Sequence, residues 1–565
     1  MSTYPRVSFG LYNLEINADS SLSSVSDLQT FSKIDDLKTG NVTSYPVATY
    51  EPNFWLLDGN YKFILENEDA VHVGMMSLSM SDVNGDFADP PVLVVNFTTP
   101  HTTDGLVLHF FQYSDDYANS IKVEYFDQNN ASILSSNYAP DSWEFEIDQV
   151  VENFKKIEIT FYSTNNPYRY LRLSGIDYGQ LIYFTTTDIK SAHVVEEIDM
   201  IGAKIIGNTC DLSIYSDDTE FSIVNPTGYY ARLNKRQPLS IYEIVNTKQV
   251  FMGRYFLDTW ENESETEMKF GCVDSVEILG RIPFKGGLWL YAGVDVQSLV
   301  YEVLNNVAKM PYELDPDLYD IMVMGWIPYT NCRDALQQIA FAVGAYVDCS
   351  RSGLIKIYKS KIVNEISSST PVLNSQFGIS APLKLRPLVT GVNIVSHNYS
   401  LGIKEVNLFD GDMTIGNFDI KFKEPVHTLS ITGASIVTSG ANFATVKVVT
   451  AGTVVLTGLN YEDSQQNVSI NNMTGVTTVP NILSIETATL VNDYNASEVV
   501  GRVNNYYQQR YLLSGKIFQP SVEIGSVVLV DSYRSSKIRG AIEKMDIDLT
   551  GGFLAQSVIV GVVDQ

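Results

Sequence analysis

Two segments decide the fold: DVQSLVYEVLNNV (Asp295–Val307) and NCRDALQQIAFAVG (Asn331–Gly344). In the first, Asp295 can cap a helix, and apolar residues recur at i, i+3, i+4, i+7 and i+8, which predicts one buried face. In the second, Asn331-x-x-Asp334 approximates a capping box with Asp in place of Glu, and Gly344 ends the helix. The two segments therefore predict two helices in a chain that is otherwise patterned for β-strands.

A hairpin is expected after the second helix. Strand-like AYVDC and LIKIYK are joined by SRSG (Ser350–Gly353), the pattern of a four-residue turn. Residues 291–384 should therefore form a small α+β module, a helix-helix-hairpin unit with Leu299 and Val303 facing its interior. Nothing in this unit indicates catalysis, and we expect the β-rich regions on either side to be built around it.

The composition indicates a folded, mainly β, multidomain protein. The 565 residues exceed what one hydrophobic core organises, and 45% hydrophobic with 18% charged residues is ordinary for globular proteins. The 33 Tyr and 26 Phe residues favour strands. The formal net charge is −28, from 66 acidic and 38 basic residues, which disfavours adsorption to duplex DNA. This charge fits a soluble surface, or a channel that must not hold a polyanion.

The cysteines indicate free thiols rather than disulfides or a metal site. Cys210, Cys272, Cys332 and Cys349 form no C-x-x-C pair and have no His at ligand spacing, and all but Cys332 fall at apolar positions of expected strands. The N-terminus lacks the pattern of a signal peptide, and no run approaches the roughly 18 apolar residues of a membrane span. We therefore expect a protein made in a reducing cytosol.

An acidic turn lies where the first β-rich region, residues 1–85, meets the next. In SDVNGDFADP, Asp82, Asn84, Asp86 and Asp89 are spaced so that their oxygens could surround a hard cation. The turn lacks a closing Glu, and the plainer interpretation is an acidic loop between domains. Calcium binding is therefore the alternative hypothesis for this turn.

Evenly spaced strands over residues 86–185 predict a β-sandwich. The order of segments is NFTTPHTTDGLVLHFF, IKVEYFDQNNASIL, FKKIEITF and PYRYLRLSGIDYG. This pattern resembles the discoidin-like, galactose-binding jelly-roll of many carbohydrate-binding modules, which implies sugar contact without catalysis. Tyr113, Tyr117 and Tyr138 fall at expected loop positions and could stack on a sugar ring, or could be ordinary loop or rim aromatics.

Two further β regions, residues 186–290 and 385–565, flank the helical module. GRYFLDTW and EMKFGCVD predict an antiparallel pair across an acidic turn, which is typical of a small barrel. A Ser- and Thr-rich stretch at about 425–484 predicts an exposed sheet or a large insertion in the second region. The Asn495-x-x-Glu498 spacing predicts a capping box for a last helix, Asn495–Arg510.

A more specific pattern runs through most of the chain. Its order is FSKIDDLKTGNVTSYPVATYEPNFWLLDG, EEIDMIGAKIIGNTCDLSIYSDDTEFSIVNP, LNKRQPLSIYE, FMGRYFLDTW, KGGLWLYAGVDVQSLVYEVLNN and NCRDALQQIAFAVGAYVDCSRSGLIKIYK, with G-x-I-E-K-M and GGF near the end. This order resembles the hub protein at the tip of phage tails. In Gram-positive siphophages and their prophages, it is the tail-associated or baseplate hub protein.

The resemblance implies a structural role. A hub closes the tail tube as a homotrimeric ring and anchors a receptor-binding protein, spike or fibre, beside the distal tail ring protein, the tail tube and the tape measure protein. It implies two hub-type β-barrels in each subunit, so that three subunits present six barrels to a tube with sixfold rings, while DNA passes without specific binding. The implied location is the virion tail tip, after assembly in the bacterial host cytoplasm. Some relatives carry a cell-wall-degrading domain after the hub, and we expect this chain to end at the hub.

No catalytic pattern is evident. The sequence holds no G-x-S-x-G elbow, Walker loop, H-E-x-x-H pattern or suggestive Cys-His pair, so we expect no enzyme activity, catalytic residue or cofactor. Two alternatives stay open. One is a carbohydrate-binding tail protein that contacts a host surface glycan through residues 86–185. The other is a polysaccharide-degrading enzyme, because two carboxylates brought together in space suffice for a glycosidase.

Overall fold

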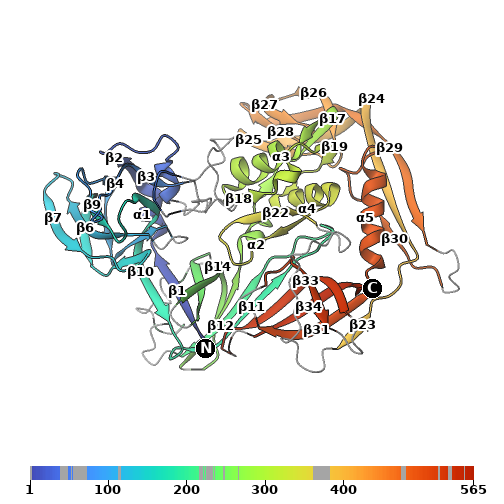
Figure 1. Cartoon of the computed structure of the whole chain (residues 1–565). Helices are drawn as coiled ribbons and strands as arrows, with labels where there is room; N and C mark the ends of the chain where they lie inside the picture. Colours follow the sequence, from blue (N-terminus) through green and yellow to red (C-terminus); the bar gives the residue numbers. More distant parts are fainter. Residues whose placement is uncertain are drawn as a thin grey trace.

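The computed structural model describes residues 3–38, 49–52, 54, 73–111, 116–215, 221, 223, 225, 233, 236–245, 248–264, 266–360, 382–472, 479–518, 522–531, 537–550, 552 and 554–564. The fold is mainly β and multidomain, as predicted, with several sheets and few helices (Figure 1). No described helix is long and apolar enough to cross a membrane.

The largest element is a 15-stranded sheet that runs through most of the molecule. Its strand order is β23-β31-β34-β33-β11-β12-β15-β14-β13-β1-β10-β5-β8, with β3 also on β10 and β32 also on β33. The bounds are β1 (Thr3–Tyr12), β3 (Met75–Met80), β5 (Leu106–Phe110), β8 (Glu144–Ile147), β10 (Tyr170–Phe184), β11 (Ile189–Glu197), β12 (Thr209–Tyr215), β13 (Pro238–Val245), β14 (Lys248–Asn262), β15 (Glu267–Val273), β23 (Leu383–Leu385), β31 (Tyr511–Phe518), β32 (Val527–Asp531), β33 (Lys537–Asp548) and β34 (Leu554–Asp564).

The prediction of two separate β-barrels is wrong for the described residues. Strand β11 pairs with β12 on one side and with β33 on the other, so the two predicted barrels share one sheet, and no closed barrel forms. Their inward side chains also share one core, in which Leu212 and Ile241 of the first region pack in the same cluster as Ile542 and Ile559 of the last. Alternating strands could not reveal this pairing, because period-2 patterning fixes the buried face and leaves the partner strand open.

A β-sandwich occupies one end of the molecule (Figure 1). Its outer layer is a five-stranded sheet of order β2-β4-β9-β6-β7, and its inner layer is the β3, β10, β5 and β8 part of the large sheet. A core that includes Val95, Phe154 and Tyr178 fills it. The outer strands and their neighbours are β2 (Ser20–Ser24), β4 (Val92–Thr103), β6 (Ala118–Phe126), β7 (Ser132–Tyr138), β9 (Val151–Thr164), α1 (Leu14–Asp19) and the 3-10 helix η1 (Ile34–Lys38).

Described residues before the sandwich region pack into two different cores. Strand β1 contributes Val7 and Phe9 to the core of the large sheet, while Ile16, Leu22 and Leu37 lie in the sandwich core. The division of the chain into domains stays a proposal, and these contacts favour assigning α1, β2, η1 and β3 to the sandwich.

The two predicted helices and the hairpin of the central module are present. Asp295 Oδ1 accepts a hydrogen bond from the Ser298 N–H at 2.7 Å, and Asn331 Oδ1 accepts one from the Asp334 N–H at 2.8 Å, so both N-caps are made. Its elements are α2 (Ser275–Leu279), β16 (Pro283–Phe284), β17 (Gly287–Asp295), α3 (Val296–Tyr301), the π-helix η4 (Glu302–Ala308), β18 (Tyr312–Leu314), η5 (Pro316–Leu318), β19 (Met322–Ile327), β20 (Thr330–Asn331), α4 (Cys332–Val343), β21 (Ala345–Asp348) and β22 (Ile355–Lys359).

The ends of the two predicted helices differ in chemistry. Helix α4 ends at Gly344, whose φ of 77° is the left-handed conformation that glycine adopts without penalty. The first helix continues from α3 into η4 and ends at Lys309, which takes φ 55° with a side chain present. The hairpin β21–β22 follows α4, with Ala345 opposite Lys359 and Asp348 opposite Lys356.

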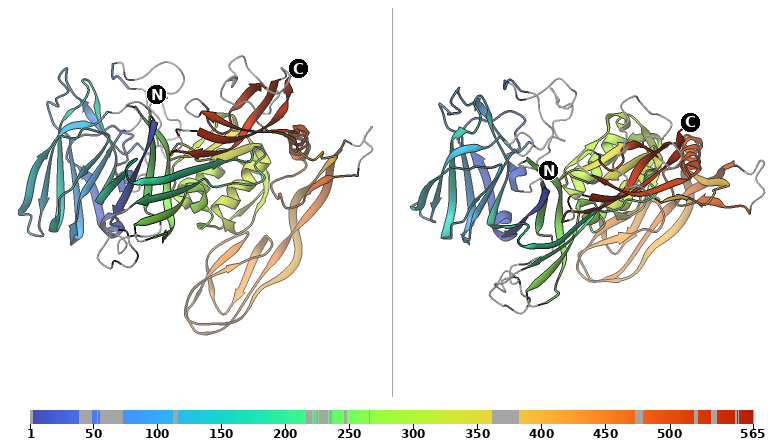
Figure 2. Two further views of the ribbon diagram at one scale, coloured as in Figure 1. Left: turned by 90° about the horizontal axis from the view of Figure 1, so that it is seen from below. Right: turned by 60° about the horizontal axis from the view of Figure 1, so that its bottom comes forward.

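A long ribbon projects from the C-terminal half (Figure 2). Strands β24 and β29 pair from Gly391–Asn471 to Met413–Gly452, so the predicted insertion begins earlier than residue 425. The distal part has its own small core around Val446 and Leu456. The bounds are β24 (Gly391–Met413), β25 (Gly416–Lys421), β26 (Val426–Thr432), β27 (Ser435–Gly440), β28 (Phe443–Val448), β29 (Gly452–Asn471) and β30 (Ile482–Ile485).

Helix α5 (Ala496–Gln508) packs against the base of this ribbon, with Val499 and Val503 buried. The helix was predicted, but its capping box is absent. The Asn495 side chain makes no hydrogen bond to the first turn, and its Oδ1 accepts instead from the Asn492 N–H at 2.8 Å. The side-chain oxygen of Asn495, which the sequence spacing predicts as a helix cap, therefore stabilises the turn before the helix instead.

All four cysteines are free and buried, in agreement with the sequence analysis. Cys210 and Cys272 lie opposite each other on β12 and β15. Burial raises the pKa of both thiols well above the ordinary value, so neither is a ready nucleophile.

We predict that Leu299→Asp lowers the free energy of unfolding by several kcal/mol or prevents folding. Leu299 is 2% exposed in the core of the central module, where an unpaired carboxylate has no counter-charge. Denaturant unfolding measures the effect. The matched control is Ser298→Asp, which adds the same charge at the exposed neighbouring position. Equal stabilities for the two variants would contradict the assignment of this face to the core.

Candidate functional site

A buried ion pair joins the central module to the large sheet. Arg351, in the turn between β21 and β22, donates from Nε to Glu196 Oε1 at 3.1 Å and from a terminal nitrogen to Glu196 Oε2 at 3.2 Å. Glu196 is fully buried on β11, and Arg351 is 10% exposed. Burial raises the pKa of Glu196, and the Arg351 charge opposes that rise. The two-point geometry fixes both the position and the orientation of the turn.

A polar network surrounds this ion pair. The Asn208 N–H donates to Asp274 Oδ2 at 2.9 Å, and the Asn208 amide donates to Ser350 Oγ at 3.2 Å. Ser350 in turn donates its N–H and hydroxyl to Asp348 Oδ1 at 2.8 and 2.5 Å. Asp274 also caps α2 by accepting the Glu277 N–H at 3.1 Å. The network connects the loop before β12, the start of α2 and the hairpin turn.

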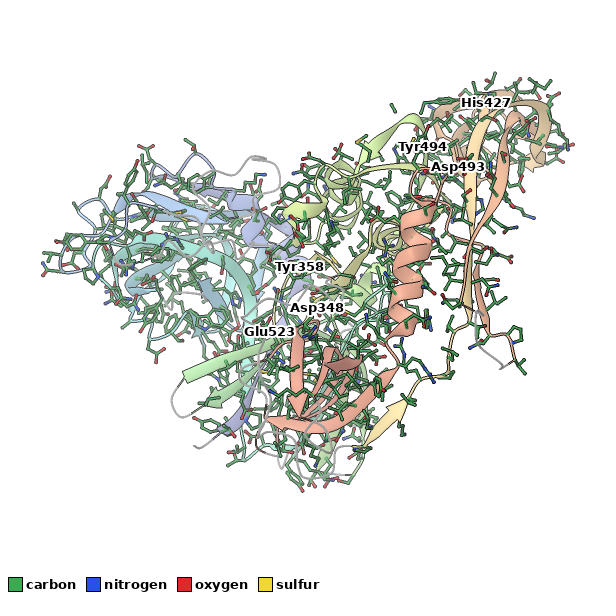
Figure 3. The ribbon with its side chains drawn as sticks, turned by 45° about the vertical axis from the view of Figure 1, so that its right-hand side comes forward. Asp348, Tyr358, His427, Asp493, Tyr494 and Glu523 are labelled. Atoms are coloured by element: carbon green, nitrogen blue, oxygen red, sulfur yellow. The ribbon has the colours of Figure 1, made fainter. Side chains whose placement is uncertain are left out.

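Acidic groups outnumber basic ones at this junction. Figure 3 shows Asp348, Tyr358 and Glu523 near one another where the module meets the C-terminal strands. Burial raises the pKa of Asp274 to about 7, against the lowering effect of its backbone hydrogen bonds. Burial likewise raises the pKa of Tyr358 far above its ordinary value. These acidic and tyrosine side chains are used in contacts within the chain. The junction is therefore suited to holding the central module against the large sheet.

A second polar cluster lies on the inner layer of the sandwich, which is itself part of the large sheet. His109 on β5 lies 3.0 Å from Asp177 Oδ2 through Nε2 and 3.6 Å from Glu144 Oε1 through Nδ1. Burial raises the pKa of Glu144, and the nearby His109 lowers it. The Trp143 ring lies 6.1 Å from the Tyr242 ring of β13, which extends this contact with aromatic surface. The sandwich is therefore attached by side chains as well as by the β1–β10 pairing.

A third contact places α5 against α4. Arg502 of α5 is 9% exposed and donates to the Phe341 carbonyl oxygen in the last turn of α4. A cation there interacts favourably with the negative end of the helix dipole. Burial nevertheless lowers the pKa of Arg502 to about 10.

The four residues of the calcium hypothesis lie in one turn without forming a cation site. Asp82 Oδ1 accepts the N–H groups of Asn84 at 2.7 Å and Asp86 at 3.0 Å, so it closes the turn itself. Asp89 is exposed. Across the described chain, no three His, Cys, Asp or Glu side chains are grouped to hold a metal ion. The geometry thus favours the plainer interpretation of an acidic loop.

The tyrosines of the glycan hypothesis are not brought together as an open platform. Tyr113 lies outside the described residues. Tyr117 and Tyr138 are half-buried and pack against the sandwich core, and Tyr138 contacts Phe145 edge-on with ring centroids 6.5 Å apart. Their role in sugar binding stays a prediction.

Sequence reasoning missed Glu196, Arg351, Asp274 and Glu144. Arg351 lies in a predicted turn, where a charged residue is ordinary and therefore gives no signal of a function. Its partner Glu196 is 155 positions away in the sequence. The available signal for Glu196 was its position in the same alternating phase as Ala192 and Val194 of β11, which predicts burial but does not identify the partner.

Comparison with known proteins identifies no family. No protein-family model matches this sequence, and no curated protein matches it. Among solved structures, the prophage MuSo2 43 kDa tail protein from Shewanella oneidensis is 9% identical with a TM-score of 0.36, over 67% of this chain and 95% of that chain. The prophage tail protein gp18 from Listeria monocytogenes is 8% identical with a TM-score of 0.38, over 68% and 92%.

Other solved structures among the matches are of another kind. The lectin domain of lectinolysin, complexed with Lewis B antigen, is 10% identical with a TM-score of 0.20, over 29% of this chain and 94% of that chain. All these TM-scores are below 0.5, so the likenesses establish neither the fold nor the function of this chain.

We predict that Arg351→Met lowers the free energy of unfolding by about 3–5 kcal/mol, because it leaves the Glu196 carboxylate buried without a counter-charge. The double variant Arg351→Met/Glu196→Met should recover a large part of that loss. Lys190→Met, at the half-exposed Lys190–Glu267 pair, is the matched control and should change stability by less than about 1 kcal/mol. Additive effects in the double-mutant cycle would show that the pair is not coupled.

We also predict that Asp274 makes the protein less stable as pH rises from about 4 to about 7. Its folded pKa of about 7 exceeds the model-peptide value of 3.8, so the native state binds the extra proton in this range and loses that advantage on ionisation. Asp274→Asn keeps an acceptor for the α2 cap without the charge. Its unfolding free energy should fall less over this range than that of the wild type, by on the order of 1–3 kcal/mol. Asp295→Asn is the N-cap control, and parallel curves for wild type and Asp274→Asn would refute the prediction.

Proposed function

We propose that this chain is a structural hub at the tip of a phage or phage-like tail, where it closes the tail tube as a homotrimeric ring. The observation that carries the proposal is the joining of the two hub-like β regions by the β11–β33 pairing around one core. The helical module carrying the same resemblance is clamped to that sheet by Arg351 and Glu196. The described parts of the two β regions thus share one sheet, and the module is held to that sheet by an ion pair.

A structural rather than an enzymatic role agrees with how the chain uses its polar groups. The buried carboxylates described above are engaged within the chain: Glu196 binds Arg351 of the module, Asp274 accepts the Asn208 N–H, and Glu144 lies beside His109. The proposed partners are the distal tail ring protein, the tail tube and the tape measure protein, with a receptor-binding protein, spike or fibre beyond them. The net charge of −28 would let DNA pass without being held. The proposed location is the virion tail tip, after assembly in the host cytoplasm.

Glycan binding by the sandwich is a separate hypothesis that the described tyrosines do not favour. Tyr117 and Tyr138 already pack against the core, and a stacking platform needs an exposed ring face.

We predict that the purified chain assembles to a mass of three times 62.9 kDa, measured by light scattering across concentrations and with the ring partner added. A closed ring requires a heterologous contact whose rotation returns to the start after three copies. A stable monomer in the presence of tube and ring proteins would refute the trimer, as would a dimer.

A further inference from the structure

The far part of the ribbon, residues 405–460, has a core of its own. Its buried side chains, such as Val446 and Leu456, form one apolar cluster. Among the described residues, this cluster has no member in common with the core of the central module or with the core that packs on α5. We call residues 405–460 the distal domain. Within the described chain, no continuous apolar core joins it to the rest of the molecule.

The chain connection to the distal domain is a two-stranded ribbon with irregular pairing. Over residues 395–401 and 461–467, β24 and β29 pair only with each other among the described strands. The register then shifts between Leu401 and Glu405, so that three residues of β24 lie opposite Asn460. Bulges bend a strand, and a two-stranded ribbon by itself is only marginally stable. The bulge at residues 402–404 is therefore a point at which the connection can bend.

The distal domain contacts the central module through Asn442, in the turn before β28, and Figure 1 shows β25 and β28 beside β17 and β19. Asn442 is 1% exposed. Its amide nitrogen donates to the carbonyl oxygens of Ile327 at 2.8 Å and Lys285 at 3.1 Å, and its Oδ1 accepts the indole N–H of Trp326 at 2.5 Å. Both donors of the amide and one lone pair of its oxygen are thus used by the module.

The module and the base of the ribbon build the receiving site for Asn442. Gly286 has φ 66°, and a Cβ at this position would lie 2.5 Å from Asn442 Nδ2, so the close approach requires glycine. Trp326 donates its backbone N–H to the Thr489 carbonyl oxygen at 3.1 Å, and its ring lies 6.2 Å from the Tyr399 ring of β24. The indole is therefore held in place by groups outside the distal domain.

Two further contacts across this boundary are polar and more exposed. Lys285 Nζ of the module lies 4.2 Å from the Phe443 ring centroid, and Lys421 Nζ of the distal domain lies 4.1 Å from the Tyr329 ring centroid. Lys421 is exposed, and a cation over a ring contributes little at an exposed site. Asn442 is therefore the buried contact among those that hold the distal domain on the module.

We propose that the distal domain is a movable arm, that Asn442 is the latch that holds it on the central module, and that the arm bends at residues 402–404 when the latch opens. On opening, water replaces the hydrogen bonds of Asn442, Trp326, Lys285 and Ile327, so no polar group stays buried and unpaired. Two arrangements that exchange polar contacts for water differ little in free energy, so a small change at the latch shifts the population from one to the other.

Pulsed electron-spin resonance on the full chain tests the proposal, with spin labels at Met322→Cys and Lys447→Cys. Met322 is 53% exposed on β19 of the module, and Lys447 is exposed on β28 of the distal domain. The four native cysteines are buried, so the label attaches at the introduced positions. We expect one dominant distance in the chain with an intact latch. Asn442→Ala should raise the ratio of undocked to docked molecules by about tenfold or more, seen as a second distance.

The matched control is Asn417→Ala, the same change at an exposed position of β25 in the distal domain, and it should leave the distances unchanged. Trp326→Phe removes the indole donor from the module side and should shift the population in the same direction by less. Hydrogen exchange of the β28 amides shows whether the distal domain stays folded in Asn442→Ala. If it does not, Trp326→Phe decides, because it leaves the sequence of the distal domain intact. Unchanged distances in both latch variants, or a broad distribution with the latch intact, would overturn the proposal.

Discussion

The Arg351–Glu196 ion pair is the contact on which the arrangement of the molecule depends. It has no access to water on the Glu196 side, so each charge is stable there only because the other is present. A buried pair of this kind adds little net stability compared with apolar residues. Any other placement of the turn would separate the two charges and leave each of them buried without a counter-charge, which is strongly destabilising. Its effect is therefore specificity: the module sits in one orientation on the sheet.

The position of Glu196 explains why that orientation matters. Glu196 lies on β11, the strand that pairs with β12 of the first β region and with β33 of the last. The module is thus anchored at the seam between two regions that are distant in sequence. An anchor at the seam couples the module to both halves of the sheet at once.

Local signals were predictable from the sequence, and long-range pairings were not. The caps at Asp295 and Asn331 and the stop at Gly344 involve groups within four residues of each other, so spacing alone predicts them. Asn495 shows the limit of this reasoning. Its side-chain oxygen accepts a hydrogen bond from the nearby Asn492 N–H instead of capping the helix. The β11–β33 pairing and the Arg351–Glu196 contact join residues that are 155 or more positions apart in the sequence. Strand patterning does not determine such partners.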